Sequence, residues 1–469
     1  MPLKRWLWTM ALLLSCARPA AKHHADTPAT SWHYRVRVDP GLNKLTAEVC
    51  FRGAVPGELR AGKDEAASRL LYARWLGPGA RKRLQVVHGR IQMPSNERDG
   101  CLEYGVGLGE GGSLDVAVRR IGRDVLASPN AWLWRPERRA IDARATMELA
   151  LPEGIAALLP WPLVGEHRAL DAEAFRFDSY AAFGRFTPMR TQQDGVELEA
   201  AILDGTLALD GDAVGRYLRS AMRVATLSDG NFPRARMAVI VVPSAAASEP
   251  VQFGMVARGG SASVLLVMSA NADERALLHD WVLPHELSHL LLPYVERDHS
   301  WLSEGFATYY QELLLARAGL IPGDEALRRI VRSLREVGAR AGQTPLAEEC
   351  ARLELTRDYR KVYWGGAAYW LIVDVALRKR GLELDRLLAR LRNDPNARAL
   401  WTARELVARL DALSGSDLFE RTFDEAAQRA FPPFEQALGE LGVGREDQLD
   451  DDPAHVALRA QVLTTRFAY

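Results

Sequence analysis

The chain has 469 residues, of which 48% are hydrophobic and 26% are charged, as expected of a globular protein rather than a disordered one. Its length allows about two to four domains, each with its own core. Sixty basic residues balance sixty acidic residues, so the net charge gives no reason to expect nucleic acid as a partner.

The N-terminus has the features of an export signal. Two basic residues, Lys4 and Arg5, precede a short apolar run that ends in Leu13-Leu14-Ser15-Cys16. The run is too short to span a bilayer and is typical of a signal peptide within residues 1–21. Its ending resembles a bacterial lipobox, in which Cys16 is lipidated; the alternative is a plain secretory signal. We expect an exported protein, periplasmic or anchored to the outer membrane, with membrane contact only through the lipid on Cys16.

The remaining cysteines are interpreted in that light. Exported proteins fold in an oxidising compartment, where cysteines can form disulfides. Cys50 and Cys101 lie in the same part of the chain. Either they form a disulfide or both stay free thiols, and we expect the two alternatives equally. Cys350 would then be an unpaired structural thiol.

The chain divides by its periodicity. Residues 31–165 form short alternating apolar and polar runs separated by turn residues, which favours a β-sandwich. Residues 170–205 continue this pattern and would link to the next domain. Residues 206–320 combine a predicted helix at 213–227 with buried strands at 237–242 and 263–268. Residues 321–445 are predicted to be helical, and residues 446–469 to be a polar tail.

One motif carries metal chemistry, the run Pro284-His285-Glu286-Leu287-Ser288-His289. Side chains four positions apart share one helix face, so His285 and His289 can bind one ion. Glu286 is turned by about 100° around the helix axis, close enough to take a proton from a metal-bound water. Proline is tolerated in the first turn of a helix, so we expect this helix to begin or bend near Pro284.

A catalytic zinc ion needs a third protein ligand and an open position. Fifteen positions after His289 comes Glu304, near the start of a second predicted helix, in Trp301-Leu302-Ser303-Glu304-Gly305-Phe306-Ala307-Thr308-Tyr309. His299 is the alternative third ligand, because its imidazole also suits zinc. Thr308 shares a helix face with Glu304 and could support the site from outside the ligand set.

These motifs resemble those of the gluzincin metallopeptidases, especially the glycyl aminopeptidase and aminopeptidase N families. The later run Tyr363-Trp364-Gly365-Gly366 is similar to their Tyr-x-x-Gly segment, whose tyrosine hydrogen-bonds the oxyanion. The resemblance implies an α+β fold: an N-terminal β-sandwich, a thermolysin-like zinc metallopeptidase domain over residues 206–320, and a C-terminal helical region. It implies Zn²⁺ as the cofactor.

The chain departs from these families in two places. The gap between His289 and Glu304 is shorter than usual, so the connecting loop must be tight. The glycine-rich run at 253–260 lacks the carboxylate that binds a substrate amine in aminopeptidases, so that specificity is not inherited. Arg258 in this run is expected at the surface, with binding of a substrate carboxylate as the alternative. The strand at 263–268 is expected to be the sheet edge that pairs with substrate.

The sequence therefore predicts an exported zinc-dependent metallopeptidase that hydrolyses a peptide or protein substrate, with metal ligands His285, His289 and Glu304. Glu286 would act as general base, and Tyr363, or alternatively Tyr359, as oxyanion donor. The alternative is a catalytically inactive gluzincin-like scaffold or binding protein of the cell envelope. The oligomeric state is left open.

Overall fold

The computed structural model describes residues 31–52, 55–77, 80–94, 97–109, 117–136, 144–394 and 400–465. The predicted signal peptide and Cys16 lie outside these residues. Among the helices of the described ranges, none is both long and apolar enough to cross a bilayer.

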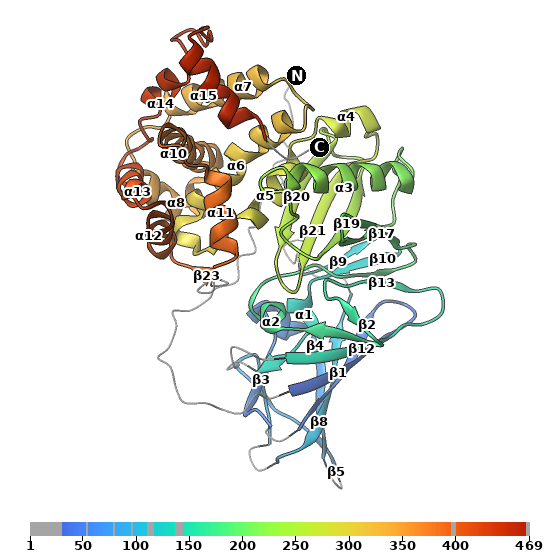
Figure 1. Cartoon of the computed structure of the whole chain (residues 1–469). Helices are drawn as coiled ribbons and strands as arrows, with labels where there is room; N and C mark the ends of the chain where they lie inside the picture. The colour runs from blue at the N-terminus through green and yellow to red at the C-terminus, as the bar shows by residue number, and fades with distance from the viewer. Residues whose placement is uncertain are drawn as a thin grey trace, which may run out of the picture.

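Three sheets form the N-terminal part within the described residues (Figure 1). The largest has the order β14-β15-β12-β1-β2-β8-β4-β5, in which only β1 and β12 pair in parallel. Its strands are β1 (Ser31–Val38), β2 (Lys44–Phe51), β4 (Leu70–Gly77), β5 (Ala80–Arg83), β8 (Gly100–Gly107), β12 (Arg144–Ala150), β14 (Leu163–Val164) and β15 (His167–Leu170). Inward side chains alternate with outward ones along β2, which explains the pattern in the sequence.

Two four-stranded sheets complete this part. One has the order β13-β16-β10-β9 and the other β11-β3-β7-β6. Their elements, with the short helices, are β3 (Glu58–Arg60), η1 (Asp64–Arg69), β6 (Val86–Val87), β7 (Arg90–Gln92), β9 (Val118–Ile121), β10 (Asp124–Ala127), α1 (Pro129–Trp132), β11 (Arg135–Pro136), β13 (Ala156–Leu158), α2 (Ala172–Arg176) and β16 (Ala182–Gly184). The core is rich in tryptophan, including the fully buried Trp132, Trp134 and Trp161.

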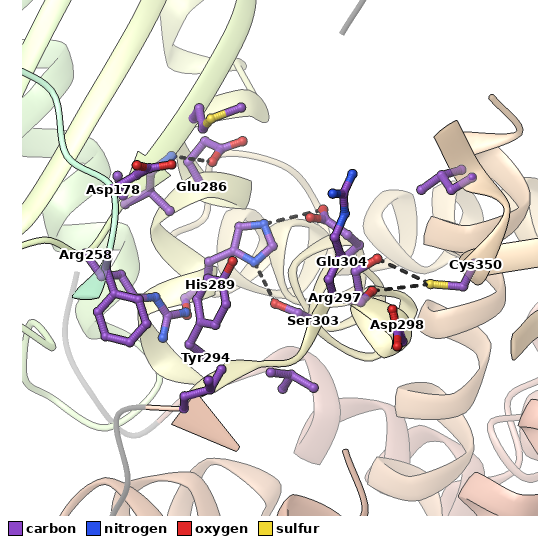
Figure 2. Close-up of a pocket in the computed structure, with 18 of the residues that line it drawn as sticks. Asp178, Arg258, Glu286, His289, Tyr294, Arg297, Asp298, Ser303, Glu304 and Cys350 are labelled. Carbon is purple, nitrogen blue, oxygen red and sulfur yellow. Dashed lines mark hydrogen bonds and ion pairs between the residues drawn. The ribbon is translucent and has the colours of Figure 1, made fainter. Parts of the chain in front are cut away.

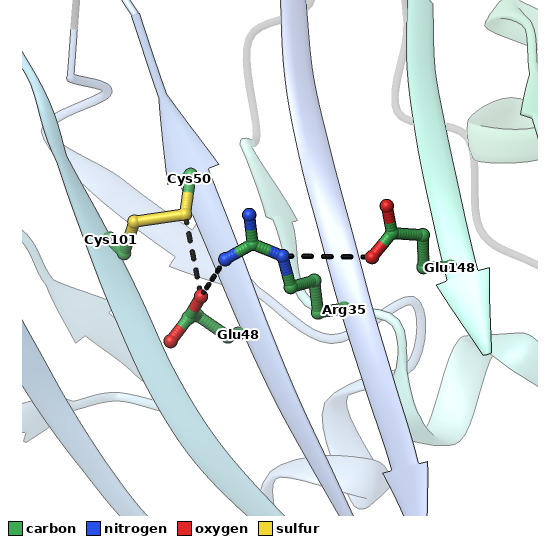
Figure 3. The surroundings of a disulfide bond; sticks show 5 residues. All are labelled: Arg35, Glu48, Cys50, Cys101 and Glu148. Carbon is green, nitrogen blue, oxygen red and sulfur yellow. Dashed lines mark hydrogen bonds and ion pairs between the residues drawn. A yellow bond between two sulfur atoms is a disulfide. The ribbon is translucent and has the colours of Figure 1, made fainter. Parts of the chain in front are cut away.

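The disulfide that the sequence left open is present. Cys50 on β2 and Cys101 on β8 are register partners on adjacent antiparallel strands, and their sulfur atoms are bonded. Figure 3 shows Arg35 beside this bond, between the carboxylates of Glu48 and Glu148. The bond therefore joins two strands of the largest sheet.

A five-stranded mixed sheet follows, with the order β17-β18-β19-β21-β20. Its strands are β17 (Met189–Gln193), β18 (Val196–Ile202), β19 (Arg236–Ser244), β20 (Val251–Ala257) and β21 (Ala262–Ser269). Helices α3 (Gly211–Thr226) and α5 (Val282–Ser288) pack on one face, and the sheet that contains β10, β13 and β16 packs on the other. The expectation that the strand at 263–268 is an edge is wrong. The run at 253–260 supplies a further strand, β20, which pairs with β21 and takes the edge.

Helices dominate the rest of the chain (Figure 1). They are α4 (Glu274–Leu278), η2 (His289–Leu291), η3 (Arg297–His299), α6 (Ser300–Arg317), α7 (Gly323–Gly338), α8 (Leu346–Ala351), α9 (Leu353–Thr356), α10 (Tyr359–Lys379), α11 (Leu384–Arg392), α12 (Ala403–Ser414), α13 (Leu418–Gln428), α14 (Glu435–Glu440) and α15 (Pro453–Leu463), with the two-stranded sheet of β22 (Tyr294–Val295) and β23 (Leu400–Trp401). Helices α6 and α10 lie at the centre of a core that includes residues from most of these helices.

The predicted polar tail is partly wrong. Asp452 caps the N-terminus of α15, whose Val462 and Leu463 are buried, and Arg317 donates a hydrogen bond to the Val462 carbonyl oxygen. Leu458 also packs against the core, and the buried Arg459 donates a hydrogen bond to the Leu441 carbonyl oxygen, so the helix is docked on the helical region. The predicted α+β class is confirmed, with a multi-sheet β region followed by a helical region.

Candidate metal centre

The histidine pair lies on a short helix against the edge of the five-stranded sheet. Helix α5 contains His285, and His289 lies in the 3₁₀ turn η2 that continues it. Pro284 occupies the first turn, where a missing N–H group leaves no hydrogen bond unmade. The helix therefore begins close to this proline, as the sequence predicts.

Glu304 comes from α6, after the tight connection that the sequence requires. The chain passes from η2 through strand β22 and the single turn η3 into α6. Glu304 lies in the second turn of α6 and faces both imidazoles. Its Oε2 atom is 3.5 Å from Nε2 of His285 and 3.5 Å from Nε2 of His289.

The donor atoms of these three residues all lie within 4.8 Å of one another. Two donors at about 2.1 Å from one tetrahedral ion would lie about 3.4 Å apart, close to the observed separations. Two imidazole nitrogens and one carboxylate oxygen are also the donors that catalytic zinc sites use. The residues therefore fit a zinc ion, and Figure 2 shows His289 and Glu304 facing each other across the site.

The charges at the site are coupled. Burial alone would raise the pKa of Glu304, but the two histidines hold it far below its usual value. Burial alone would lower the pKa of His285, but hydrogen bonding to Glu304 and the negative charges of Glu286 and Glu304 raise it overall. The site thus concentrates negative charge beside the imidazoles, as expected where a cation binds.

Glu286 points away from the ligand atoms, toward strand β20. Its Oε2 atom accepts a hydrogen bond of 2.8 Å from the backbone N–H of Val256 (Figure 2). A Cβ atom at Gly254 would lie 2.6 Å from Cγ1 of Val282 and 2.9 Å from Cγ of Glu286. Glycine at this position therefore lets α5 pack against the strand, and the strand holds the carboxylate in place.

Tyr363 reaches the site from α10. Its ring stacks on His285, with centroids 6.0 Å apart, and it lines the same cavity as Glu304. Burial and the nearby carboxylates raise the pKa of Tyr363 well above its usual value, so the phenol keeps its proton. Tyr359 packs edge-on against Tyr363, with ring centroids 6.3 Å apart, one helical turn from the site. The hydroxyl at the site therefore belongs to Tyr363.

Two glycines bring α6 and α10 together. A Cβ atom at Gly305 would overlap the backbone of Gly366, and one at Gly366 would overlap the carbonyl of Trp301. Gly305 follows Glu304, and Gly366 is three residues after Tyr363. The glycines of the two sequence motifs thus touch through their backbones, and this contact places the tyrosine beside the carboxylate.

The other candidate ligand and supporting residue lie elsewhere. His299 packs against Phe423, with ring centroids 5.6 Å apart, and is outside the cluster of donor atoms. The Oγ1 atom of Thr308 is buried and has no hydrogen-bond partner among the described residues. His285 is instead supported by Gln311, and His289 by Ser303. A signal for Gln311 existed, since it lies seven positions after Glu304 and so on the same helix face.

The expectation of a surface position for Arg258 is wrong, because its side chain is buried. The guanidinium donates hydrogen bonds to the carbonyl oxygens of Leu292 and His289, and it lies over the ring of Tyr294. Burial lowers the pKa of Arg258 to about 10, so the side chain stays charged at neutral pH. Its charge satisfies carbonyls at the end of the histidine-bearing segment.

The site opens into a cavity of about 390 Å³. Glu286, His289, Glu304 and Tyr363 line one part of it, and strand β20 lines another. Asp178, from the connection between α2 and β16, brings the N-terminal part into the wall. The cavity thus gives an extended ligand access to both the donor atoms and the edge strand.

Comparisons with known proteins agree with this geometry. Residues 284–363 match the family model of the M61 glycyl aminopeptidases. A search of curated protein sequences gave no significant match. An aminopeptidase N family protein from Idiomarina loihiensis is similar in structure, with a TM-score of 0.67 and 15% identity over 88% of this chain and 78% of that one.

An M1 zinc metallopeptidase from Deinococcus radiodurans is similar with a TM-score of 0.54 and 17% identity, over 86% of this chain and 94% of that one. A mutant of that enzyme bound to a Tyr-Ser-Ala substrate gives a TM-score of 0.52 and 16% identity, with the same coverage of 86% and 94%. At these identities the structures show a shared fold. Together with the family match, which spans the motif from Pro284 to Tyr363, they confirm the predicted resemblance to the gluzincin aminopeptidase families and the predicted enzyme class, a zinc metallopeptidase.

Proposed function

We propose that this protein is an exported zinc-dependent peptidase in which His285, His289 and Glu304 hold the metal and Glu286 is the general base. The observation that carries the proposal is the convergence of three zinc-type donor atoms within 4.8 Å, at the side of a cavity that also contains the Glu286 carboxylate. A purely structural zinc site has no need of such a base.

The residues around the metal would divide the reaction between them. A bound zinc ion supplies a Lewis acid that lowers the pKa of water and polarises a carbonyl group. The Glu286 carboxylate accepts a proton from the attacking water and later gives it to the leaving amine. The Tyr363 phenol, which keeps its proton because burial raises its pKa, donates a hydrogen bond to the oxygen on which negative charge develops.

A peptide is the substrate class that this geometry favours. Strand β20 is an edge of its sheet, and Gly254 to Ala257 line the cavity next to Glu286. An extended peptide can add to such an edge through its backbone, next to the reacting groups. A mutant of the structurally similar enzyme from Deinococcus radiodurans is bound to a Tyr-Ser-Ala substrate, which supports a peptide ligand here as well.

Export is the second part of the proposal, with a lipid on Cys16 as the membrane anchor. The Cys50–Cys101 disulfide supports it, since disulfides persist in oxidising compartments. Labelling cells with radioactive palmitate tests the anchor. Label is expected in the wild-type protein and not in Cys16→Ala, and an unlabelled wild-type protein would count against lipidation.

A catalytically inactive scaffold with the same fold is the alternative, and a pair of measurements separates the two. We expect the purified protein to contain about one zinc ion per chain, and we expect Glu286→Gln to keep this zinc because the carboxylate is not a ligand. On a peptide library or casein, the turnover number of Glu286→Gln should be about 10²- to 10⁴-fold lower than that of the wild-type protein. Equal turnover by the two proteins would eliminate the hydrolase, and zinc binding without turnover in either would favour the scaffold.

A further inference from the structure

The ring nitrogens of the two histidines that face away from Glu304 both contact α6. Nδ1 of His285 is 2.9 Å from Oε1 of Gln311, and Nδ1 of His289 is 3.1 Å from Oγ of Ser303. Gln311 is 6% exposed and His285 is 5% exposed, so water competes little for the first of these contacts. Figure 2 shows the second, with His289 between Ser303 and Glu304.

The orientation of the Gln311 amide is fixed by its neighbour. Nε2 of Gln311 donates a hydrogen bond of 3.2 Å to Oε1 of Glu312. The amide oxygen therefore faces His285, where it can only accept. Nδ1 of His285 must then carry the proton, which leaves the lone pair of Nε2 directed at Glu304 and the metal position.

A single helix therefore contributes to the placement of all three donor atoms. Glu304 is itself a ligand, Ser303 precedes it, and Gln311 lies about two turns further along α6. We propose that Gln311 and Ser303 are positioning residues, which hold the histidine rings with Nε2 toward the metal, and that their neutral oxygen atoms limit the strength with which the site binds zinc. This inference rests on the proposed metal site.

The chemistry of the two acceptors supports this role. A hydrogen bond from a ligand imidazole to an outer partner fixes the tautomer and increases the basicity of the metal-binding nitrogen. Charged acceptors do this more strongly than neutral ones. An amide and a hydroxyl therefore orient the rings without the additional donor strength that a carboxylate would provide.

The experiment compares the zinc affinities of purified full-length variants by competition with a chromophoric chelator. Gln311→Met removes the acceptor at similar side-chain length, and we expect it to weaken zinc binding about ten- to a hundred-fold. Ser303→Ala should weaken it in the same direction. The paired exchange Gln311→Glu with Glu312→Gln keeps the contact between neighbours and places a carboxylate against Nδ1 of His285, so it should bind zinc more tightly than wild type.

Thr308→Val is the matched control, because it removes a buried hydroxyl from the same helix that has no partner among the described residues. It should bind zinc as wild type does. The absorption spectrum of the Co²⁺-loaded protein gives a second readout, which should change in Gln311→Met and stay constant in Thr308→Val.

The outcomes are distinguishable. If wild type binds no zinc, the proposed function fails together with the inference. If wild type binds zinc but Gln311→Met binds it equally well, only the positioning role is overturned. If Gln311→Met does not fold, the paired exchange decides: an affinity equal to or below that of wild type contradicts the role of the neutral acceptor.

Discussion

The β region and the helical region of this protein are held together in different ways. In the largest N-terminal sheet, strand pairing is reinforced by the Cys50–Cys101 bond, and charged side chains such as Arg35 stay largely exposed. In the helical region Cys350 is a buried free thiol, as predicted, and the charged side chains next to α6 are buried. The disulfide and the candidate metal site are thus in different parts of the molecule.

The buried charges of the helical region lie along α6, beyond the metal ligands. Tyr309 donates to Asp374, and Tyr310 donates to Asp385, over 3.0 Å and 2.9 Å. Arg317, near the end of the same helix, is paired with Asp385 over 3.0 Å. One end of α6 is therefore fixed by glycine contacts and the other by ion pairs. Helix α6, which carries Glu304 and the two residues that contact the ring nitrogens of His285 and His289, is thus held at both ends, whereas the β region supplies support and one wall of the cavity.

The largest effect is expected at the contact between helices α6 and α10. Gly366→Ala would place a methyl group against the carbonyl of Trp301, so α10 must move away from α6. We expect a loss of about 4 kcal/mol or more in the free energy of unfolding, together with loss of peptidase activity. Urea unfolding and turnover measure the two effects. Gly439→Ala, in α14, where nothing lies within 4 Å of the added Cβ, is the control and should lower neither. A stable, active Gly366→Ala protein would contradict the importance of this contact.

Tyr363→Phe is expected to affect catalysis and leave stability nearly unchanged. It removes one donor to the developing oxyanion, which costs about 10² to 10³ in kcat. Steady-state kinetics should show this loss, while zinc content and the thermal unfolding midpoint stay close to wild type. Tyr359→Phe is the matched control on the same helix and should retain its kcat. A similar loss in both variants would remove the special role of Tyr363.

The smallest effect on function is expected in the β region. Replacing Cys50 and Cys101 together by serine should lower the free energy of unfolding by about 2 to 4 kcal/mol, because the unfolded chain is no longer cross-linked. Zinc affinity and kcat should stay as in wild type, since neither sulfur lies near the metal site. Chemical unfolding and kinetics on one preparation check both statements. A changed zinc affinity would show that the two regions are coupled more closely than we conclude.

Much of the site could be predicted, because its chemistry is local in sequence. The four-residue spacing of His285 and His289 places both imidazoles on one helix face. A carboxylate beside them on a buried helix, as at Glu286, indicates a general base. The α+β class followed from periodicity and the resemblance. Apart from the polar tail, the predicted domain limits stay predictions, and so do the catalytic roles of the site residues, because no observation above tests them.

What sequence reasoning missed depends on long-range packing. The burial of Arg258 depends on carbonyl oxygens of Leu292 and His289, more than thirty positions away in the chain, which a local pattern does not reveal. Strand β20 was not predicted as the sheet edge, because a glycine such as Gly254 weakens a strand pattern. In the structure this glycine lets helix α5 pack closely against the strand. The docking of α15 relies on contacts of Val462 and Leu463 with distant helices and on the buried Arg459, which hydrogen-bonds the Leu441 carbonyl oxygen.

The contact between Gly305 and Gly366 also has a consequence for how the chain tolerates change. Two motifs that are 61 positions apart in the sequence behave as one unit in space, because neither glycine can gain a side chain while the other helix keeps its place. Substitutions at the two positions are therefore not independent, and their effects should not add. Variation in the length of the intervening segment, by contrast, leaves this unit intact as long as both helices can still meet there.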